Sequence, residues 1–343
     1  MSLEPAFPAP APAAPPTPPK TSSLRAMMSR LATNPLGGVV VAMLLIFGIS
    51  CALSPHFLTT FNMVIIARAL AFVGLVTIGQ SILMILGELD LSVGAIGGLS
   101  GVAGGILMVQ MGLNPWLSLV ICLMLGAACG LVNGLLITQL RLHSLVLTIG
   151  MAGVYGGANL VMTKGVAITG VPHDISFLGR GLVFGFPVPF VVLAVCLAVV
   201  AFVMMRTPVG RYIYAIGSNA QAARMLGIRV NAIRMGAFAL AGFLSALAGI
   251  LMVARLGTAQ PSIGDTWVLS PIAAAVIGGV ATTGGLGSPV GAVLGAVIIG
   301  IIEDIIVLFG ISPYWQSVVS GGIVVLAISF DALARRYLNR DAA

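Results

Sequence analysis

Charged side chains are scarce in this sequence: Asp, Glu, Lys and Arg together make up only 7% of its 343 residues. An ordinary soluble domain carries roughly 25% of such residues, mostly on its surface. Hydrophobic residues, by contrast, make up 59% of the chain. This composition excludes a protein with a water-facing surface all round, and it predicts that lipid surrounds most of the folded chain.

The long apolar runs also lack the alternation of apolar and polar residues that is typical of membrane β-barrel strands. Since only helices and closed barrels satisfy their backbone hydrogen bonds in lipid, we predict an all-α fold, a polytopic bundle of about ten transmembrane helices. Each span needs about 20 apolar residues. The predicted spans cover approximately 36–53, 63–87, 92–111, 115–138, 143–163, 187–206, 231–256, 267–283, 286–310 and 315–332.

Features of a catalytic or metal site are absent as well. The four cysteines lie within apolar runs and have no C-x-x-C spacing, so we expect no disulfide and no metal ligand. The sequence has no H-E-x-x-H motif, His cluster or Ser/Lys pair that would support an intramembrane enzyme. It also has no G-x-x-x-x-G-K-[ST] phosphate loop, so we expect the chain to hydrolyse no ATP itself. We predict no catalytic residues.

The net charge is +7, but the basic residues do not form the patch of a nucleic-acid-binding protein, and we expect no nucleic-acid partner. They lie in the gaps between apolar runs, as expected where cytoplasmic loops collect Lys and Arg. Both termini and the longest polar loop are therefore predicted to be cytoplasmic. The predicted parts are a disordered Pro/Ala-rich tail (1–33), a transmembrane domain (34–337) with a cytoplasmic loop at about 207–230, and a second tail (338–343).

A weak internal repeat relates two parts of the chain. Residues 63–98 and 231–279 each carry a long apolar run, a polar break and a further apolar segment. With the orientation above, the two units enter the membrane from opposite sides. This predicts two inverted halves, an arrangement that places solute pathways at the interface between repeats. Whether the short, Gly-rich segments 92–111 and 267–283 span fully or form half-helices stays open.

Acidic residues mark the first break, GELDLSVGAIGGLSG at 87–101, where Glu88 and Asp90 lie between two apolar runs. An acid at membrane depth is costly unless it is paired or hydrated. One interpretation makes both acids solvated turn residues at the cytoplasmic interface, with Asp90 capping the helix that begins at Ser92. The other makes the segment a broken helix that lines a solute route.

The second break, ARLGTAQPSIGDTWVLS at 254–270, leaves a similar choice for Asp265, which either caps the next helix in an outer loop or faces the route. Glu303 and Asp304 are adjacent in an apolar helix and therefore point about 100° apart. We expect one of them to face a wet cavity. The candidate pathway residues are Asp90, Ser92, Asp265, Ser270 and Glu303.

The loop at 207–230 contains a short amphipathic stretch, AQAARML, which Ser218 or Asn219 can cap and which Gly227 closes. A helix of one or two turns is marginal in isolation. We therefore predict that this helix docks on a partner at the cytoplasmic face.

Several motifs in this order resemble one known family. GRYIYAIGSNAQAARMLGI resembles the coupling segment of bacterial monosaccharide importer permeases, the ribose-permease-like family of ATP-binding-cassette transporters. GELDLSVGAIGGLSG resembles that family's G-x-[IL]-D-L-S-V-G motif, and VARLGTAQP and AAAVIGGVATTGGLGSPVGAVLGAVIIGII resemble its C-terminal half. The resemblance covers about residues 36–337.

The resemblance implies a type II importer fold in a bacterial inner membrane and transport of a monosaccharide, such as a ribose-like sugar or polyol. It implies three partners: a cytoplasmic ATPase that binds ATP and Mg, a periplasmic solute-binding protein and a second permease subunit, most simply a second copy of this chain. This chain itself would bind no cofactor. The residues implied to couple to the ATPase are Gly217, Ser218, Asn219, Ala222, Ala223, Leu226 and Gly227.

The sequence departs from the family's pattern in places. Both acids of its Y-E-L-D-A-I-A-A segment are lost at 267–271, and Glu303 and Asp304 stand where the family often has paired Asn. The solute therefore stays open, and nucleosides or branched-chain amino acids are alternatives. A different class, an ion-coupled secondary transporter, would use Asp90, Asp265 or Glu303 instead of an ATPase.

Overall fold

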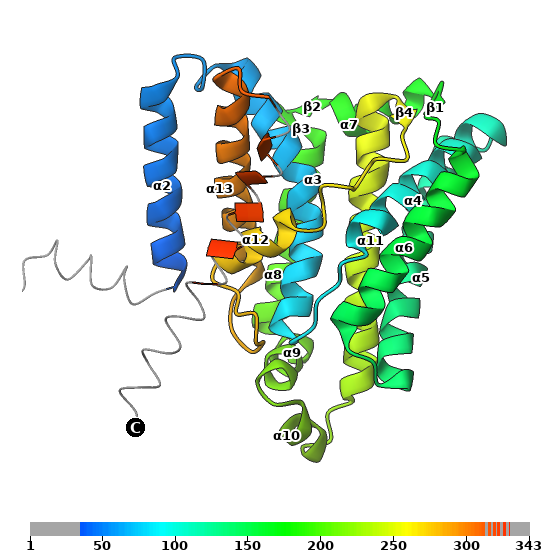
Figure 1. Cartoon of the computed structure of the whole chain (residues 1–343), viewed down its shortest axis with the longest axis vertical. Helices are drawn as coiled ribbons and strands as arrows, with labels where there is room; N and C mark the ends of the chain where they lie inside the picture. The colour runs from blue at the N-terminus through cyan, green and yellow to red at the C-terminus, as the bar shows by residue number, and fades with distance from the viewer. Residues whose placement is uncertain are drawn as a thin grey trace, which may run out of the picture.

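The computed structural model describes residues 35–312 and, beyond them, residues 315, 316, 318, 319, 321, 322, 325, 326 and 329. The predicted tails, 1–33 and 338–343, lie outside these residues, and so does most of the predicted span 315–332. Helices dominate the described part (Figure 1). Eight of its helices are long and apolar enough to cross a membrane, which confirms the prediction of a polytopic helical bundle.

The eight spans follow the predicted apolar runs closely, since each begins and ends where polar residues, Gly or Pro interrupt the run. Capping side chains mark two of the starts: Thr59 accepts the N–H of Asn62, and Asn114 accepts those of Trp116 and Leu117. The spans are α2 (Pro35–Leu53), α3 (Thr60–Ile85), α4 (Val93–Gly105) with its π-helical continuation η1 (Ile106–Gln110), α5 (Pro115–Leu140), α6 (Ser144–Thr163), α8 (Val188–Arg206), α11 (Val230–Leu256) and α13 (Pro289–Leu308).

The two doubtful segments have different outcomes. α4 and η1 together form an 18-residue span. The segment at 267–283 contains only α12 (Ser270–Ile277), whose eight residues rise about 12 Å, too little to cross a hydrocarbon core of about 30 Å. α12 is therefore a half-helix, and the non-helical segments before α4 and α12 reach into the bundle (Figure 1).

The two halves interlock through their long helices. α11 packs against α4 and α5, while α3 packs against α12 and α13, so each long helix contacts the broken helix of the other half. α3 and α11 also contact each other and run in opposite directions (Figure 1). After each of these two helices comes a glycine in the left-handed backbone conformation, Gly87 with φ 82° and Gly257 with φ 74°. This arrangement agrees with the inverted repeat that the sequence indicates.

The two breaks meet at a pair of glycines. A Cβ built on Gly94 would lie 2.3 Å from the Gly264 carbonyl oxygen, and one built on Gly264 would lie 2.1 Å from the Gly94 oxygen. Close by, a Cβ on Gly249 of α11 would lie 2.0 Å from the Gly97 oxygen of α4. Only glycine, which has no side chain, fits such a close backbone contact. The two breaks therefore cross where Gly94 meets Gly264.

Short elements cover the two ends of the bundle (Figure 1). One end carries two small antiparallel ladders: β1 pairs with β4 and thereby joins the two halves, and β2 pairs with β3. The opposite end carries α9 and α10. The bounds are β1 (Ile168–Thr169), the 3-10 helix η2 (His173–Ile175), α7 (Ser176–Arg180), β2 (Leu182–Val183), β3 (Phe186–Pro187), α9 (Pro208–Ser218), α10 (Ala220–Met225) and β4 (Thr258–Ala259).

The crossing of the breaks yields a test. Gly264→Ala should destabilise the protein by about 1–3 kcal/mol, because its Cβ would meet the Gly94 oxygen and its φ is 94°. Gly112→Ala is the matched control, since Gly112 also has a positive φ, 63°, but open space around it. Thermal unfolding of the detergent-solubilised chain should show a clearly lower midpoint for Gly264→Ala. Equal midpoints for the two variants would contradict the close contact.

Candidate functional site

The end of the molecule that carries α10 holds the predicted coupling helix. Of the two cap candidates, Asn219 is the one used: its side-chain oxygen accepts the N–H groups of Gln221 at 3.0 Å and Ala222 at 2.9 Å. The helix ends at Met225, Leu226 is its C-cap residue, and Gly227 follows with φ 80°. The local sequence thus accounts for both ends of this short helix.

The tip of α10 is apolar and exposed. Met225 is 85% exposed and Leu226 is 79% exposed, whereas Ala223 faces inward and is buried. Ser218, Asn219 and Ala222 are also exposed. Exposure of two large apolar side chains to solvent at the tip of a protruding helix is unfavourable. It therefore indicates a protein partner at this position.

Gly217 belongs to the predicted coupling residues, but it faces the bundle. A Cβ built on it would lie 1.9 Å from the Ile85 carbonyl oxygen at the end of α3 and 2.6 Å from the Gly285 nitrogen. The Gly285 N–H donates to the same Ile85 oxygen at 2.8 Å, and a Cβ on Gly284 would lie 2.8 Å from the Gly217 oxygen. We call Ile85, Gly217, Gly284 and Gly285 the glycine junction.

The glycine junction joins α9 to both halves of the protein. On one side it holds the last residue of α3, immediately before the first break, and on the other the turn between α12 and α13. The Tyr214 hydroxyl strengthens the second contact by donating to the Gly287 carbonyl at 2.8 Å. α9 therefore contacts the chain next to both broken helices. Sequence reasoning missed this contact of the turn, although its run of glycines was a visible signal.

A buried polar network holds the first break in place. Asp90 is wholly buried and its Oδ1 accepts the Ser92 N–H at 2.7 Å and the Ser92 hydroxyl at 2.6 Å. Asn133 of α5 donates to the Ser92 Oγ at 2.8 Å, and the Tyr155 hydroxyl of α6 donates to the Asn133 Oδ1 at 3.0 Å. Asp90 thus fixes Ser92, the residue that precedes α4, but it does not cap the helix itself, which has no side-chain cap hydrogen bond.

Helix α6 also satisfies the backbone of both breaks. The Leu89 N–H donates to the Ser144 Oγ at 3.2 Å, and the Leu91 N–H donates to the Thr148 Oγ1 at 3.1 Å. These two hydroxyls are four residues apart and so lie on one face of α6. In the second break, the Pro261 carbonyl accepts the side-chain amide of Asn159 at 2.8 Å.

Glu88 has a partner that the sequence did not reveal. Its carboxylate lies 2.9 Å from the Nε of Arg234 near the start of α11, an ion pair in which this Nε forms no hydrogen bond, and the Glu88 residue is buried. The interpretation of Glu88 and Asp90 as solvated turn residues is therefore wrong. Both acids are paired inside the protein, which lowers the cost of placing them beside lipid.

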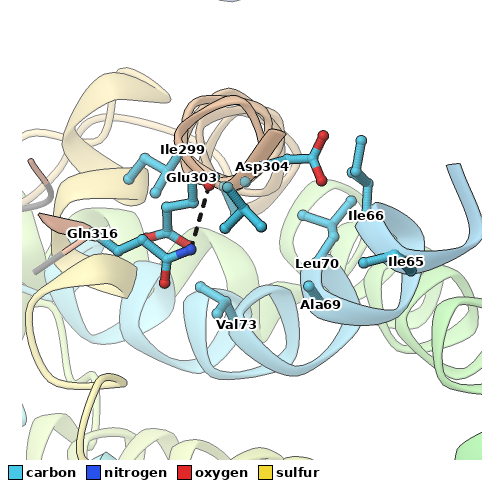
Figure 2. A pocket seen from close by; sticks show the side chains of 12 residues that line it. Ile65, Ile66, Ala69, Leu70, Val73, Ile299, Glu303, Asp304 and Gln316 are labelled. Carbon is cyan, nitrogen blue, oxygen red and sulfur yellow. Dashed lines mark hydrogen bonds between the residues drawn. The ribbon is translucent and has the colours of Figure 1, made fainter. Parts of the chain in front are cut away.

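The remaining pathway candidates lie in different settings. Asp265 is exposed, and it does not cap α12, because that helix begins five residues later at Ser270, which is buried. Glu303 and Asp304 both line a cavity of about 220 Å³ between α3, α13 and residue 316. In Figure 2 Glu303 lies beside Gln316, whereas Asp304 points to the other side, where the Asn62 amide donates to its carboxylate at 2.8 Å.

Comparison with known proteins agrees with this geometry. Residues 62–328 match the family described as "Branched-chain amino acid transport system / permease component". The chain belongs to this permease family. It is 37% identical over 283 residues to the ribose import permease of Bacillus subtilis (strain 168), covering 81% of this chain and 87% of that protein. It is 34% identical over 297 residues to the ribose import permease of Escherichia coli (strain K12), covering 85% and 92%. The autoinducer 2 import system permease of Enterobacter sp. (strain 638) is 34% identical over 314 residues, 91% of each chain.

Membership of this permease family defines the general role of the chain. It is a multi-pass membrane protein and a transporter subunit rather than an enzyme. Permeases of ATP-binding-cassette importers act with an ATPase and a periplasmic solute-binding protein, so these two are its partners. The predicted roles of individual coupling and pathway residues stay predictions.

The ion pair between the halves can be tested by a double-mutant cycle. Arg234→Gln should destabilise the protein by about 2 kcal/mol, because it leaves the buried Glu88 without its charged partner. Adding Glu88→Gln should restore part of that loss, since no charge is then buried alone. Unfolding of the full chain in detergent measures both effects, with Arg206→Gln, an exposed arginine at the end of α8, as the control. Strictly additive losses would argue against the pair.

Proposed function

We propose that this chain is the membrane subunit of an ATP-binding-cassette importer for a monosaccharide, such as a ribose-like sugar or a polyol. The names of the relatives, ribose and autoinducer 2 import permeases, support this class of solute. The proposal that ATP hydrolysis is coupled to transport through α10 is supported by the exposed tip of this helix and by the glycine junction behind it. One feature offers a docking surface, and the other joins that surface to both halves of the permease.

In the proposed mechanism, ATP and Mg bind to the partner ATPase alone. The end of the bundle with α10 faces the cytoplasm of a bacterial cell, in agreement with the basic residues of the 207–230 loop. When the ATPase closes on ATP, it moves α10, and the glycine junction passes the displacement to the end of α3 and the turn before α13. Coupling of this kind requires that the permease has two conformations, and that the ATPase and the solute each bind one of these conformations more strongly than the other.

The proposed complex contains two permease subunits, most simply two copies of this chain, in the inner membrane. The route for the solute would use weak polar contacts, because tight binding inside a channel blocks release. Asp265, Ser270 and Glu303 remain the candidates for such contacts. Asp90 and Ser92 are assigned a different role, since their network fixes the start of α4 and leaves neither of them exposed.

Two alternatives differ in their support. The relatives do not favour an ion-coupled secondary transporter, and Asp90 has no exposed surface from which to bind an ion. Branched-chain amino acids are the second candidate solute, because the matching family is described by them.

Uptake by the chain in liposomes with its ATPase and binding protein separates these cases. We expect uptake of labelled ribose that needs ATP and is not driven by an ion gradient alone; uptake without ATP would overturn the proposal.

The docking role of α10 has its own test. Leu226→Glu should weaken co-purification with the ATPase at least about tenfold and abolish ATP-dependent uptake, because a charge replaces an apolar contact. Ala222→Arg should have the same effect through its bulk. Phe184→Glu is the control, since Phe184 is 97% exposed on the β2–β3 turn at the opposite end. All variants should elute as folded protein in size exclusion. Unchanged co-purification of both α10 variants would rule out docking at this helix.

A further inference from the structure

A cleft of about 690 Å³ lies on the inner flank of α10, separate from its exposed tip. Its walls come from the first break, from the end of α5 and the turn into α6, and from α10 and α11. Three arginines from three different helical regions line it: Arg141 after α5, Arg224 of α10 and Arg234 of α11. We call it the arginine cleft.

The charges of the arginine cleft are unbalanced. Among its described lining residues, Glu88 is the one carboxylate, and it already pairs with Arg234. Arg224 donates to the neutral side chain of Asn231 at 3.5 Å, and no ion pair is found for Arg141 among the described residues. The guanidinium groups of Arg141 and Arg224 are both exposed, so two positive charges face an open space. Guanidinium groups bind phosphate with paired hydrogen bonds.

An apolar track leads away from this cleft. Thr138, which lines it, lies on the same face of α5 as Leu131 and Leu135, at the three- and four-residue spacings of one helical stripe. Leu131 and Leu135 are each 44% exposed. A molecule with a phosphate in the cleft therefore finds an apolar surface running from it along a membrane span. Free phosphate and a partner's carboxylate would make no use of that surface.

We propose that the arginine cleft binds the headgroup of an anionic phospholipid, with the phosphate between Arg141 and Arg224 and an acyl chain along Leu131 and Leu135 of α5. The proposal rests on the cytoplasmic orientation given above, because the cytoplasmic leaflet carries the anionic lipids that basic pockets at span ends attract. The bound lipid would tie α10 to the end of α5. It would thereby hold the coupling helix at a fixed height relative to the membrane surface.

The test uses the full chain in a neutral detergent, without ATPase, nucleotide or sugar, so its result does not depend on transport. Phosphatidylglycerol and phosphatidylcholine with the same acyl chains are titrated, and binding is followed by native mass spectrometry and by the unfolding midpoint. We expect phosphatidylglycerol to bind more tightly than phosphatidylcholine and to raise the midpoint. Arg141→Gln and Arg224→Gln should each weaken phosphatidylglycerol binding about tenfold, the loss of one charge-assisted pair of hydrogen bonds.

Arg211→Gln is the matched control, because Arg211 is an exposed arginine of α9 that does not line the cleft. A loss equal to that of Arg141→Gln would show general attraction only and overturn the site. Inorganic phosphate and glycerol phosphate form the second arm, and we expect neither to raise the midpoint at matched concentration. If these anions raised the unfolding midpoint and Arg141→Gln removed that effect, the ligand of the cleft would be a free anion. This result would overturn the proposal of a lipid. Loss of ATPase binding in Arg141→Gln with unchanged lipid binding would make the cleft a protein-docking surface and would also overturn the proposal.

Discussion

Lipid offers no hydrogen bonds to a peptide group, and this chain leaves the helical conformation twice inside the bundle. Each unsatisfied backbone group there would cost several kcal/mol, so the protein must supply the partners itself. Ser144 and Thr148 of α6 accept the N–H groups of the first break, and Asn159 of the same helix donates to the second. One helix thus supplies hydrogen-bond partners to the non-helical segments of both halves.

Close backbone packing is the second consequence of a lipid environment. Between helices in a membrane there is little hydrophobic driving force, and small residues that let backbones approach take its place. Where α5 crosses α11, a Cβ on Gly242 would lie 2.1 Å from the Gly126 oxygen. The crossing of the breaks at Gly94 and Gly264 and the glycine junction at α9 follow the same rule. Contacts of this kind have no flexible side chain to absorb a displacement, so they fit the proposed transmission of movement from α10 into the bundle.

The acidic residues show how local reasoning reached its limit. An acid between apolar runs indicates either a wet pathway or an internal partner, and the sequence contains no information that separates the two. Asp90 found its partners 2 and 43 positions away, and Glu88 found Arg234 at the start of α11. Asp265 failed as a cap because a turn of several residues follows it before α12 begins. Glu303 and Asp304 both line the cavity beside α13, whereas the sequence led us to expect only one of them to do so.

The sequence by itself determined the helical spans, the short helix α10, the doubled break and the family, because hydrophobic runs, caps and motifs act through neighbouring residues. The tertiary structure alone decided that 267–283 contains only a half-helix, that both acids of the first break are buried and paired, and that Gly217 faces inward onto Ile85. It also assembled the arginine cleft from three separate regions. These outcomes depend on which face of each helix meets another helix, and that choice is made by packing between residues far apart in the chain.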